Sequence, residues 1–267
     1  MRSGKNGRRK LSAQRVHSDC GLAILTYHAL DDQPSVISMP PAAFRGQVEA
    51  LARRGLRGVS LAQAFEQRER EGRFPQDAVV LTFDDGYLSV ITEGLPPLAA
   101  RGFTATVFLA SGLVGLTAAE ARQRNPDLDR DLLDWGQATE LLQAGWEIGS
   151  HTVSHPDLTR LAPAACEREL ADARSQLEQA LQTPVESLAY PYGRLDAEAR
   201  RAAARHYRRA CTTRLDRCGP ATDPLRIDRI DMYYMQSARR FDELLDGGLN
   251  HWLRARRSLR ALKRLAR

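Results

Sequence analysis

Cysteine is scarce in this sequence. Cys20, Cys166, Cys211 and Cys218 are the four cysteines among 267 residues. Small secreted domains that depend on disulfides have a much higher density of cysteine. No two of these cysteines have the CxxC spacing of a thiolate metal site. The sequence therefore predicts neither a disulfide framework nor a cysteine-bound metal, and a chain with reduced thiols is the simpler interpretation.

Long hydrophobic runs are missing as well. A membrane-spanning helix needs about 20 consecutive apolar residues, and no run in this chain approaches that length. The basic amino-terminal stretch continues into residues 11–19, which lack the apolar core that a signal peptide requires. We therefore expect a cytoplasmic location.

Acidic residues are absent from both ends of the chain. Residues 1–15 contain six Lys or Arg and residues 250–267 contain seven, and neither stretch has an Asp or Glu. This pattern predicts a basic amino-terminal arm over residues 1–19. Aromatic residues make up only 6% of the chain and form no series suited to base stacking, so nucleic acid is not the expected partner of these ends.

The basic carboxyl-terminal segment, residues 241–267, also carries an apolar stripe. Its apolar residues recur at helical spacing: Leu249, Trp252, Leu253, Leu259, Leu262 and Leu265. The pattern predicts a basic amphipathic helix. Such a helix could lie on an anionic membrane surface, here the inner face of the membrane, or it could dock on the body of the protein. The sequence favours neither alternative.

What the sequence does contain is a pair of carboxylates at the end of a predicted strand. Residues 79–83 are suited to an interior strand of a parallel sheet, and Asp84, Asp85 and Gly86 follow at once. The carboxyl ends of such strands carry the active sites of α/β folds. The alternative is a simple turn in which one aspartate caps the next helix.

Two histidines follow another predicted strand about 65 residues later. His151 and His155 come after residues 147–150. On a helical turn, positions i and i+4 share one face, so we expect both imidazoles to reach one ion. Two imidazoles and a carboxylate form a metal site with open positions for water and substrate, which suits zinc and its neighbours. The two strand ends together predict such a site.

A third strand end completes a recognisable pattern. The segments TFDDGY, SHTVSH and YPYG, in this order and at these spacings, resemble the polysaccharide deacetylase family, the NodB-homology domain of carbohydrate esterases. LTYHAL near the start and LRIDRID after the third motif agree, so the resemblance covers roughly residues 20–235. It implies a distorted, incomplete (β/α) barrel with parallel strands. It also implies a metal-dependent hydrolase that removes acetyl groups from N-acetylated sugars of a polysaccharide or of a lipid- or nucleotide-linked precursor.

The resemblance also implies a role for each motif residue. Asp84 is expected to be the general base. Asp85, His151 and His155 are expected to bind one divalent metal ion, with zinc as the preferred ion. The main-chain N–H of Tyr192 is expected to donate to the oxyanion. These roles fit amide hydrolysis, which needs a polarised carbonyl, a proton acceptor and a donor for the developing negative charge.

The sequence departs from the family pattern in two ways. Many members have an arginine where this chain has Ala189, and the late Leu-x-His stretch that supplies a general acid is not visible. His28 is the best-placed candidate for the acid, with a structural role at a strand end as the alternative. Arg229 is the candidate substitute for the arginine, because an apolar strand face would force it to find a partner. The alternative for Arg229 is a surface ion pair with a neighbouring aspartate.

These departures leave two classes of function open. The first is an active N-deacetylase with an N-acetylated glycan as its partner. The second is a catalytically weak or inactive family member that binds glycan or membrane. The complete set of Asp84, Asp85, His151 and His155 argues for the enzyme, because a protein that only binds has no need of all four.

Strand and helix patterns alternate along most of the chain, which predicts a parallel sheet with helices outside it. Strands are expected at residues 23–27, 58–60, 79–83, 105–109, 147–150, 187–190, 209–213 and 226–230, and helices at residues 41–54, 61–71, 91–101, 135–144, 163–182 and 196–205. The length allows one large catalytic domain, expected over residues 20–240. Residues 112–134 are predicted to be an active-site loop, followed by Trp135 in either the groove or the core.

Overall fold

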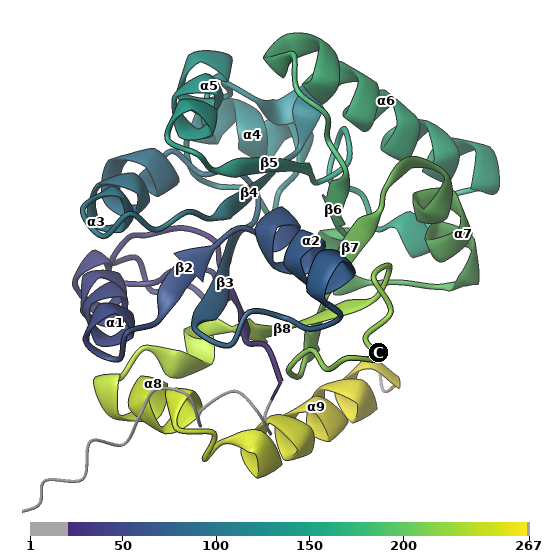
Figure 1. Ribbon diagram of the computed structural model, residues 1–267. Coiled ribbons are helices and arrows are strands. Elements are labelled where there is room, and N and C mark those ends of the chain that lie inside the picture. The colour runs from purple at the N-terminus through teal and green to yellow at the C-terminus, as the bar shows by residue number, and fades with distance from the viewer. Residues whose placement is uncertain (1–20, 266–267) are drawn as a thin grey trace, which may run out of the picture.

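The computed structural model describes residues 21–265, with side chains described as far as residue 259. Eight parallel strands lie inside a shell of helices (Figure 1). The strands are β1 (Ile24–Tyr27), β2 (Arg57–Val59), β3 (Ala78–Phe83), β4 (Thr106–Leu109), β5 (Glu147–Ser150), β6 (Ser187–Ala189), β7 (Arg209–Leu215) and β8 (Ile227–Asp231). Each predicted strand is confirmed to within two residues at either end.

Seven of these strands close into a barrel. β1 pairs with β8 on one edge and with β3 on the other, which completes the ring. β2 is left out of it because β3 changes partner along its length. The first half of β3, residues 78–80, pairs with β2, and Thr82 and Phe83 pair with β4. The predicted (β/α) barrel is therefore confirmed, with seven strands in its ring in place of the usual eight.

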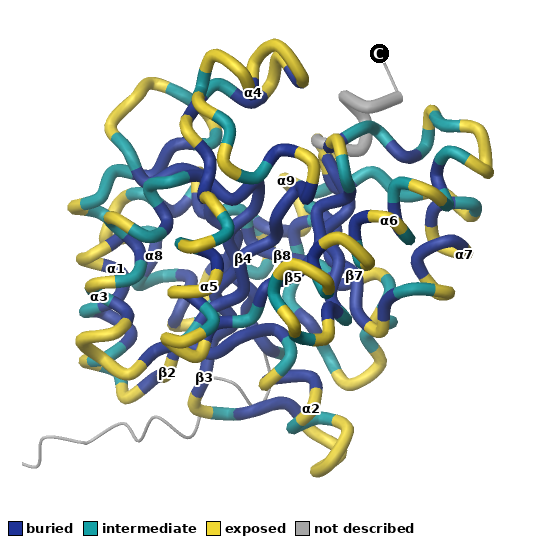
Figure 2. Tube along the Cα trace, turned by 90° about the horizontal axis from the view of Figure 1, so that it is seen from above, coloured by how far each residue is buried: buried dark blue, intermediate teal, exposed yellow. Residues whose placement is uncertain are grey.

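Most helices cover the outside of this barrel, whereas α2 (Leu61–Glu71) lies across one end of it and packs on its interior (Figures 1 and 2). The other helices are α1 (Pro41–Arg53), α3 (Leu95–Ala99), α4 (Ala118–Arg124), α5 (Trp135–Gln143), α6 (Pro163–Leu181), α7 (Ala197–His206), α8 (Ala238–Leu245) and α9 (Asn250–Leu265). α4 lies inside the segment predicted to be a loop. Its start carries a capping box, in which Thr117 and Glu120 bind each other's main-chain N–H.

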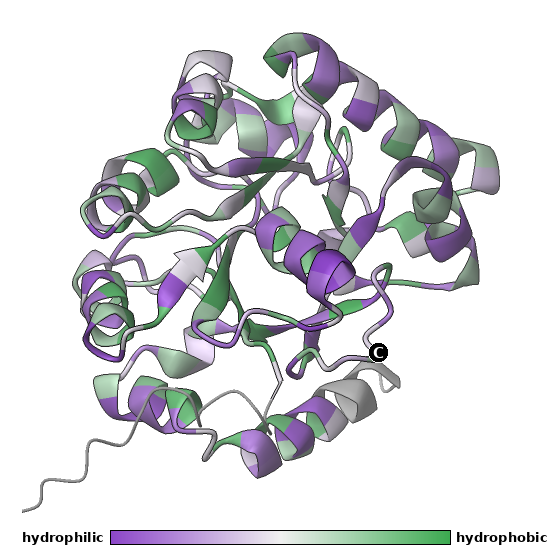
Figure 3. Ribbon diagram, in the orientation of Figure 1, coloured by the Kyte–Doolittle hydropathy of each residue, from purple (hydrophilic) through white to green (hydrophobic). Residues whose placement is uncertain are grey.

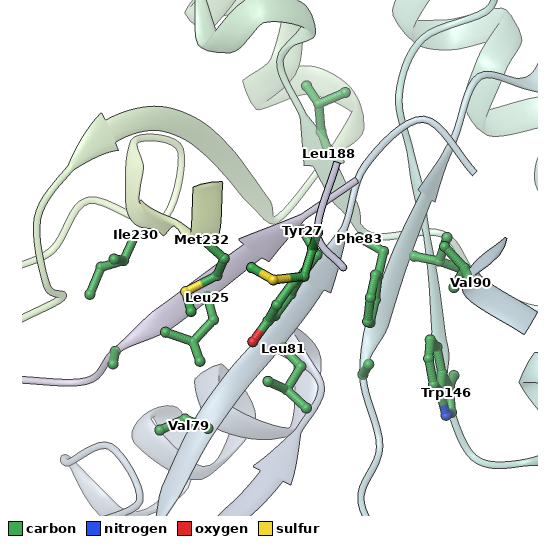
Figure 4. Close-up of a cluster of buried hydrophobic side chains, with 14 of the residues drawn as sticks. Leu25, Tyr27, Val79, Leu81, Phe83, Val90, Trp146, Leu188, Ile230 and Met232 are labelled. Atoms are coloured by element: carbon green, nitrogen blue, oxygen red, sulfur yellow. The ribbon is translucent and has the colours of Figure 1, made fainter. Parts of the chain in front are cut away.

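Alternation along the strands sorts side chains into two apolar layers. In β1 and β3, Leu25 and Leu81 belong to the layer between barrel and helices, whereas Ile24 and Val80 belong to the barrel interior. Figure 4 shows the outer layer, where the Phe83 ring stacks on other aromatic rings of that layer. The period of two places residue 84 on the interior side, in line with residues 80 and 82.

The outer faces of the helices are polar and exposed, whereas the strands are apolar and buried (Figures 2 and 3). Among residues 21–265, no helix has the length and apolar character needed to cross a bilayer. The amino-terminal arm expected at residues 1–19 lies outside the described residues.

The carboxyl-terminal segment forms two helices, and the second docks on the barrel. Leu253 of α9 is fully buried, and the Trp252 ring packs edge-on against Tyr234, with the ring centroids 5.5 Å apart. The Arg240 guanidinium of α8 lies 4.4 Å from the centroid of the Trp252 ring. Arg257 forms an ion pair with Asp216. Of the two alternatives for this segment, the described part of α9 therefore supports docking, because Leu253 and Trp252 already pack on the protein.

Candidate active site and metal centre

The motif residues meet at the carboxyl ends of the barrel strands. Asp84 and Asp85 follow β3, His151 follows β5, and Tyr192 follows β6. His28 comes directly after β1, and Arg229 reaches the same place from within β8. The remaining candidate, His155, lies against His151, with the ring centroids 4.7 Å apart. The structure therefore brings all seven candidate residues together.

Asp85, His151 and His155 form a buried group in which one ligand atom from each residue lies within 4.8 Å of the others. Asp85 Oδ1 is 3.4 Å from the Nε2 atoms of both histidines. His151 Nδ1 lies 2.6 Å from the Ala189 carbonyl, which places the proton on Nδ1 and leaves Nε2 free to bind a metal. Two imidazoles and one carboxylate that converge in this way fit a divalent metal ion.

The two histidines do not lie on a helical turn, so that part of the sequence interpretation is wrong. Thr152 and His155 both have left-handed backbone conformations, with φ of 70° and 58°. The His155 N–H donates to Thr152 Oγ1 at 3.0 Å. The N–H groups of residues 153 and 154 donate to the Glu169 carboxylate at 2.9 and 3.0 Å. The imidazoles converge because this hydrogen-bonded loop turns twice through left-handed conformations.

Asp84 faces Arg229 in the barrel interior. Arg229 Nη1 and Nη2 donate to Oδ1 and Oδ2 of Asp84 at 2.7 and 2.6 Å, a bidentate pair. Arg229 also donates through Nε to the Thr212 carbonyl at 3.0 Å. Arg229 is fully buried, so the proposed surface ion pair with a neighbouring aspartate is not what the structure shows. Neither Asp84 nor Asp85 caps a helix.

The pKa values of the two aspartates are set by opposing effects. Burial alone would raise the pKa of Asp84, but the charge and hydrogen bonds of Arg229 outweigh burial and lower it. Burial would likewise raise the pKa of Asp85, but the neighbouring histidines, His151 first among them, outweigh burial and lower it. Burial lowers the pKa of His155 to about 4. Both carboxylates are therefore ionised and His155 is neutral near pH 7, whereas burial lowers the pKa of His151 but Asp85 and Asp84 outweigh that effect and raise it.

The turn after β3 is tight. Asp85 and Gly86 both have left-handed conformations, with φ of 69° and 70°. A Cβ atom on residue 86 would lie 2.5 Å from Leu109 Cδ2, so a side chain there would displace Leu109 in addition to the strain of a left-handed φ, and glycine avoids both. Asp85 adopts a conformation that non-glycine residues seldom use, and such residues concentrate at functional sites.

His28 and Tyr192 border the centre on its open side. His28 Nε2 is 3.9 Å from Asp84 Oδ2, and the His28 side chain is 21% exposed. The Tyr192 ring packs edge-on against His155, with the centroids 4.8 Å apart, and its hydroxyl donates to Asp127 at 2.8 Å. Tyr192 has φ of 59°, which turns its main chain sharply at the end of β6.

Two residues of the β4–α5 connection, Asn125 and Asp127, join the site; they lie in the segment predicted to be an active-site loop, although neither was singled out. The Asp127 carboxylate accepts a hydrogen bond from the Tyr192 hydroxyl, and the Asn125 side chain contacts His155. The sequence contains little to indicate them, because each lies 30 or more positions from the residue that it contacts. The capping box of α4 is the one local signal that this connection is ordered.

A model of the polysaccharide deacetylase family matches residues 71–210, just over half of the chain. The chain belongs to this family. The resemblance inferred from the sequence motifs is thereby confirmed.

Individual relatives agree with this assignment. YxkH of Bacillus subtilis (strain 168) is 26% identical over 182 residues, which are 68% of this chain and 60% of that protein. The poly-beta-1,6-N-acetyl-D-glucosamine N-deacetylase of Escherichia coli O157:H7 is 32% identical over 152 residues, 54% of this chain and 22% of that protein. The chain thus spans less than two thirds of the length of both relatives.

Among solved structures, Streptococcus pyogenes deacetylase PplD in complex with acetate is similar to this chain with a TM-score of 0.69. The two share 26% sequence identity, and the similarity covers 79% of this chain and 92% of PplD. The barrel described above is therefore the fold of this family.

Proposed function

We propose that this chain is a metal-dependent N-deacetylase that hydrolyses the acetamide group of an N-acetylated sugar, in a polysaccharide or in a lipid- or nucleotide-linked precursor. The observation that carries the proposal is the pairing of two adjacent carboxylates with different partners. Asp85 faces His151 and His155 as a ligand set, and Asp84 faces Arg229 as an ionised group beside that set.

The proposed ion is zinc, bound by Asp85, His151 and His155. Such an ion supplies Lewis acidity, which polarises an amide carbonyl and makes water a better nucleophile near neutral pH. Asp84 is then placed to accept the proton of the attacking water. Arg229 keeps Asp84 ionised and fixes both of its oxygens, so the carboxylate needs no rearrangement before it accepts the proton.

His28 is the proposed general acid. Its Nε2 lies close to Asp84, and its partly exposed ring can reach a leaving amine on the open side of the centre. A histidine that donates a proton to the amine completes the cleavage of the carbon–nitrogen bond. The main-chain N–H of Tyr192 is the proposed donor to the oxyanion, because Tyr192 forms a left-handed turn and its ring packs against the ring of the proposed ligand His155.

The proposed partner is an N-acetylated glycan. Sequence similarity to the Escherichia coli poly-beta-1,6-N-acetyl-D-glucosamine N-deacetylase supports an N-acetylglucosamine polymer as the first substrate to test. Tyr192 is 37% exposed and Tyr233 is 42% exposed, and aromatic rings at the ends of β6 and β8 suit the apolar faces of sugar rings. Contact with an anionic membrane has weaker support, because Leu253 is buried and Trp252 packs against Tyr234. Among the described side chains of α9, this leaves mainly Leu259 and arginines such as Arg254 and Arg256 exposed.

Acetate release decides between an enzyme and a protein that only binds glycan. The parent protein is incubated with N-acetylglucosamine oligomers and polymers, with zinc or with an excess of chelator. We expect acetate release that depends on zinc and is lost in His151→Ala. Glycan binding by the parent without acetate release on any of these substrates would favour the catalytically inactive alternative.

A further inference from the structure

The connection between β4 and α5 lies directly along the loop that carries the two histidines. The Ser111 N–H donates to the Thr152 carbonyl, and the Gly112 N–H donates to the Val153 carbonyl, both at 3.0 Å. A Cβ atom on Gly112 would lie 3.0 Å from the Val153 carbonyl oxygen, so the two segments approach closely. Figure 2 shows α4, which belongs to this connection, projecting from one end of the barrel.

Asn125, at the end of α4, makes a further contact with this loop. Its side-chain amide donates to the His155 carbonyl, with Nδ2 3.1 Å from the oxygen. The same Nδ2 lies 3.2 Å from His155 Nδ1, so the amide packs against the ring edge away from Asp85, while the hydrogen bond that holds the residue is the one to the His155 carbonyl. Asn125 Oδ1 accepts the Asp127 N–H at 3.0 Å, which fixes the orientation of the amide. Asn125 is only 8% exposed, so this polar side chain is buried against His155.

His155 needs such support because its backbone conformation is unfavourable for a residue with a side chain. Both of its main-chain polar groups are held by side chains, the N–H by Thr152 and the carbonyl by Asn125. Its ring packs against Tyr192, whose hydroxyl is held by Asp127. Of the residues that hold His155, Asn125 alone contacts both the main chain and the imidazole.

We propose that Asn125 is a positioning residue for His155, which holds this ligand in its left-handed conformation so that Nε2 points at the metal. The inference rests on the proposed metal site. Partners that orient a metal ligand typically change metal affinity or activity by about 10–100-fold when they are removed. Without Asn125, we expect His155 to populate backbone conformations in which its imidazole no longer converges with His151 and Asp85.

Zinc affinity of the full chain, measured by competition with a chromogenic chelator, tests the inference. Asn125→Ala is expected to weaken zinc binding by about 10–100-fold. Gln123→Ala, an exposed position on the same helix, is the matched control and should bind zinc like the parent. Cobalt absorption provides a second readout, because the visible bands of bound Co²⁺ report ligand geometry and should change in Asn125→Ala but not in Gln123→Ala.

A second variant separates positioning from folding. Asn125→Ser keeps a hydroxyl that can accept the Asp127 N–H, but this side chain ends one bond short of the His155 carbonyl. It should therefore lose zinc affinity while the metal-free protein melts close to the parent. In a His155→Ala background, Asn125→Ala should cause no additional loss of zinc affinity, because the ligand that it orients is already gone.

The outcomes distinguish the inference from the proposed function. A parent protein that does not bind zinc would contradict the proposed metal site itself. If the parent binds zinc and both Asn125 variants bind it within twofold of the parent, the positioning role is wrong and the metal site stands. Equal losses in Gln123→Ala and Asn125→Ala would also overturn the role, since they would reflect the stability of α4 alone.

Discussion

Asp84 and Asp85 are adjacent in the sequence, yet each has a different partner. The alternation of β3 directs Asp84 into the barrel, where Arg229 neutralises it. The left-handed turn at Asp85 directs the second carboxylate to the histidines. One strand end thus supplies both a proton acceptor and a metal ligand. The division of roles follows from backbone geometry, because the two side chains are chemically identical.

Asp84→Asn should abolish most turnover while zinc stays bound. The amide keeps the shape of the carboxylate but cannot accept a proton, and removal of a general base typically costs about 10²–10⁴-fold in rate. The measurements are kcat for acetate release and zinc content of the purified variant. Activity within a few fold of the parent would show that another group accepts the proton.

Arg229→Met should destabilise the metal-free protein by roughly 3–5 kcal/mol, because it leaves the Asp84 carboxylate buried without its partner. Arg214→Met is the matched control. Arg214 pairs with Asp228 at 3.4 Å and is 39% exposed, so its loss should cost about 1 kcal/mol or less. Urea unfolding of both variants measures the difference. Equal destabilisation of the two variants would mean that the burial of the Asp84–Arg229 pair does not determine the loss of stability.

At the scale of elements, the sequence predicted the strands and most of the helices well, and the histidine loop and α4 poorly. Strand positions follow from local apolar runs, which is why β3 and β5 and the residues after them were located. The loop at residues 151–155 was given helical geometry, because i, i+4 spacing carries no information about the contacts of Glu169 and Thr152 that shape it. α4 was missed although its capping box was present, since a helix of seven residues has too few turns for a periodic pattern.

α9 offers two leucines with opposite environments. Leu253 is fully buried, whereas Leu259 is 52% exposed. Leu253→Ala should lower the free energy of unfolding by about 2–5 kcal/mol, and Leu259→Ala should change it by about 0.5 kcal/mol or less. Thermal and urea unfolding check both values. Similar small effects at the two positions would show that α9 does not dock in solution, and vesicle binding would then become the better explanation of its apolar stripe.

The contact between α6 and α7 should make stability depend on pH in acid. Glu167 of α6 accepts hydrogen bonds from Arg205 and His206 of α7, and the hydrogen bond from Arg205 is the main reason that the pKa of Glu167 falls to about 2. Because the folded-state pKa is depressed, this contribution is present above the unfolded-state pKa of about 4.3 and is lost as the pH falls through about 2. The side chain is a third exposed, so we expect about 1 kcal/mol or less.

A comparison of Glu167→Gln with the parent measures this contribution. The parent should be more stable than the variant at pH 6, and the difference should vanish towards pH 2. A difference that is the same at both pH values would mean that the ionised carboxylate is not its cause.

For the whole molecule, the family motifs and the alternation of strands and helices were sufficient to predict a (β/α) barrel, but not how the barrel closes. Closure depends on the register of β3, which pairs first with β2 and then with β4. No local pattern encodes that exchange. The same limit applies to Asn125, whose contact with His155 exists only after the β4–α5 connection has packed on the histidine loop.

The barrel joins ligands from two separated strand ends, so a bound metal should stabilise the whole fold. An ion that binds only the folded state at a free concentration one hundred times its Kd adds about 2.7 kcal/mol. For a domain of this size, that corresponds to a rise in Tm of roughly 5–10 °C. Calorimetry of the parent with zinc and with chelator should show this shift, and His151→Ala should melt at the same temperature in both. An unchanged Tm for the parent would mean that Asp85, His151 and His155 do not bind the ion tightly. That result would contradict the proposal that the deacetylase depends on a metal.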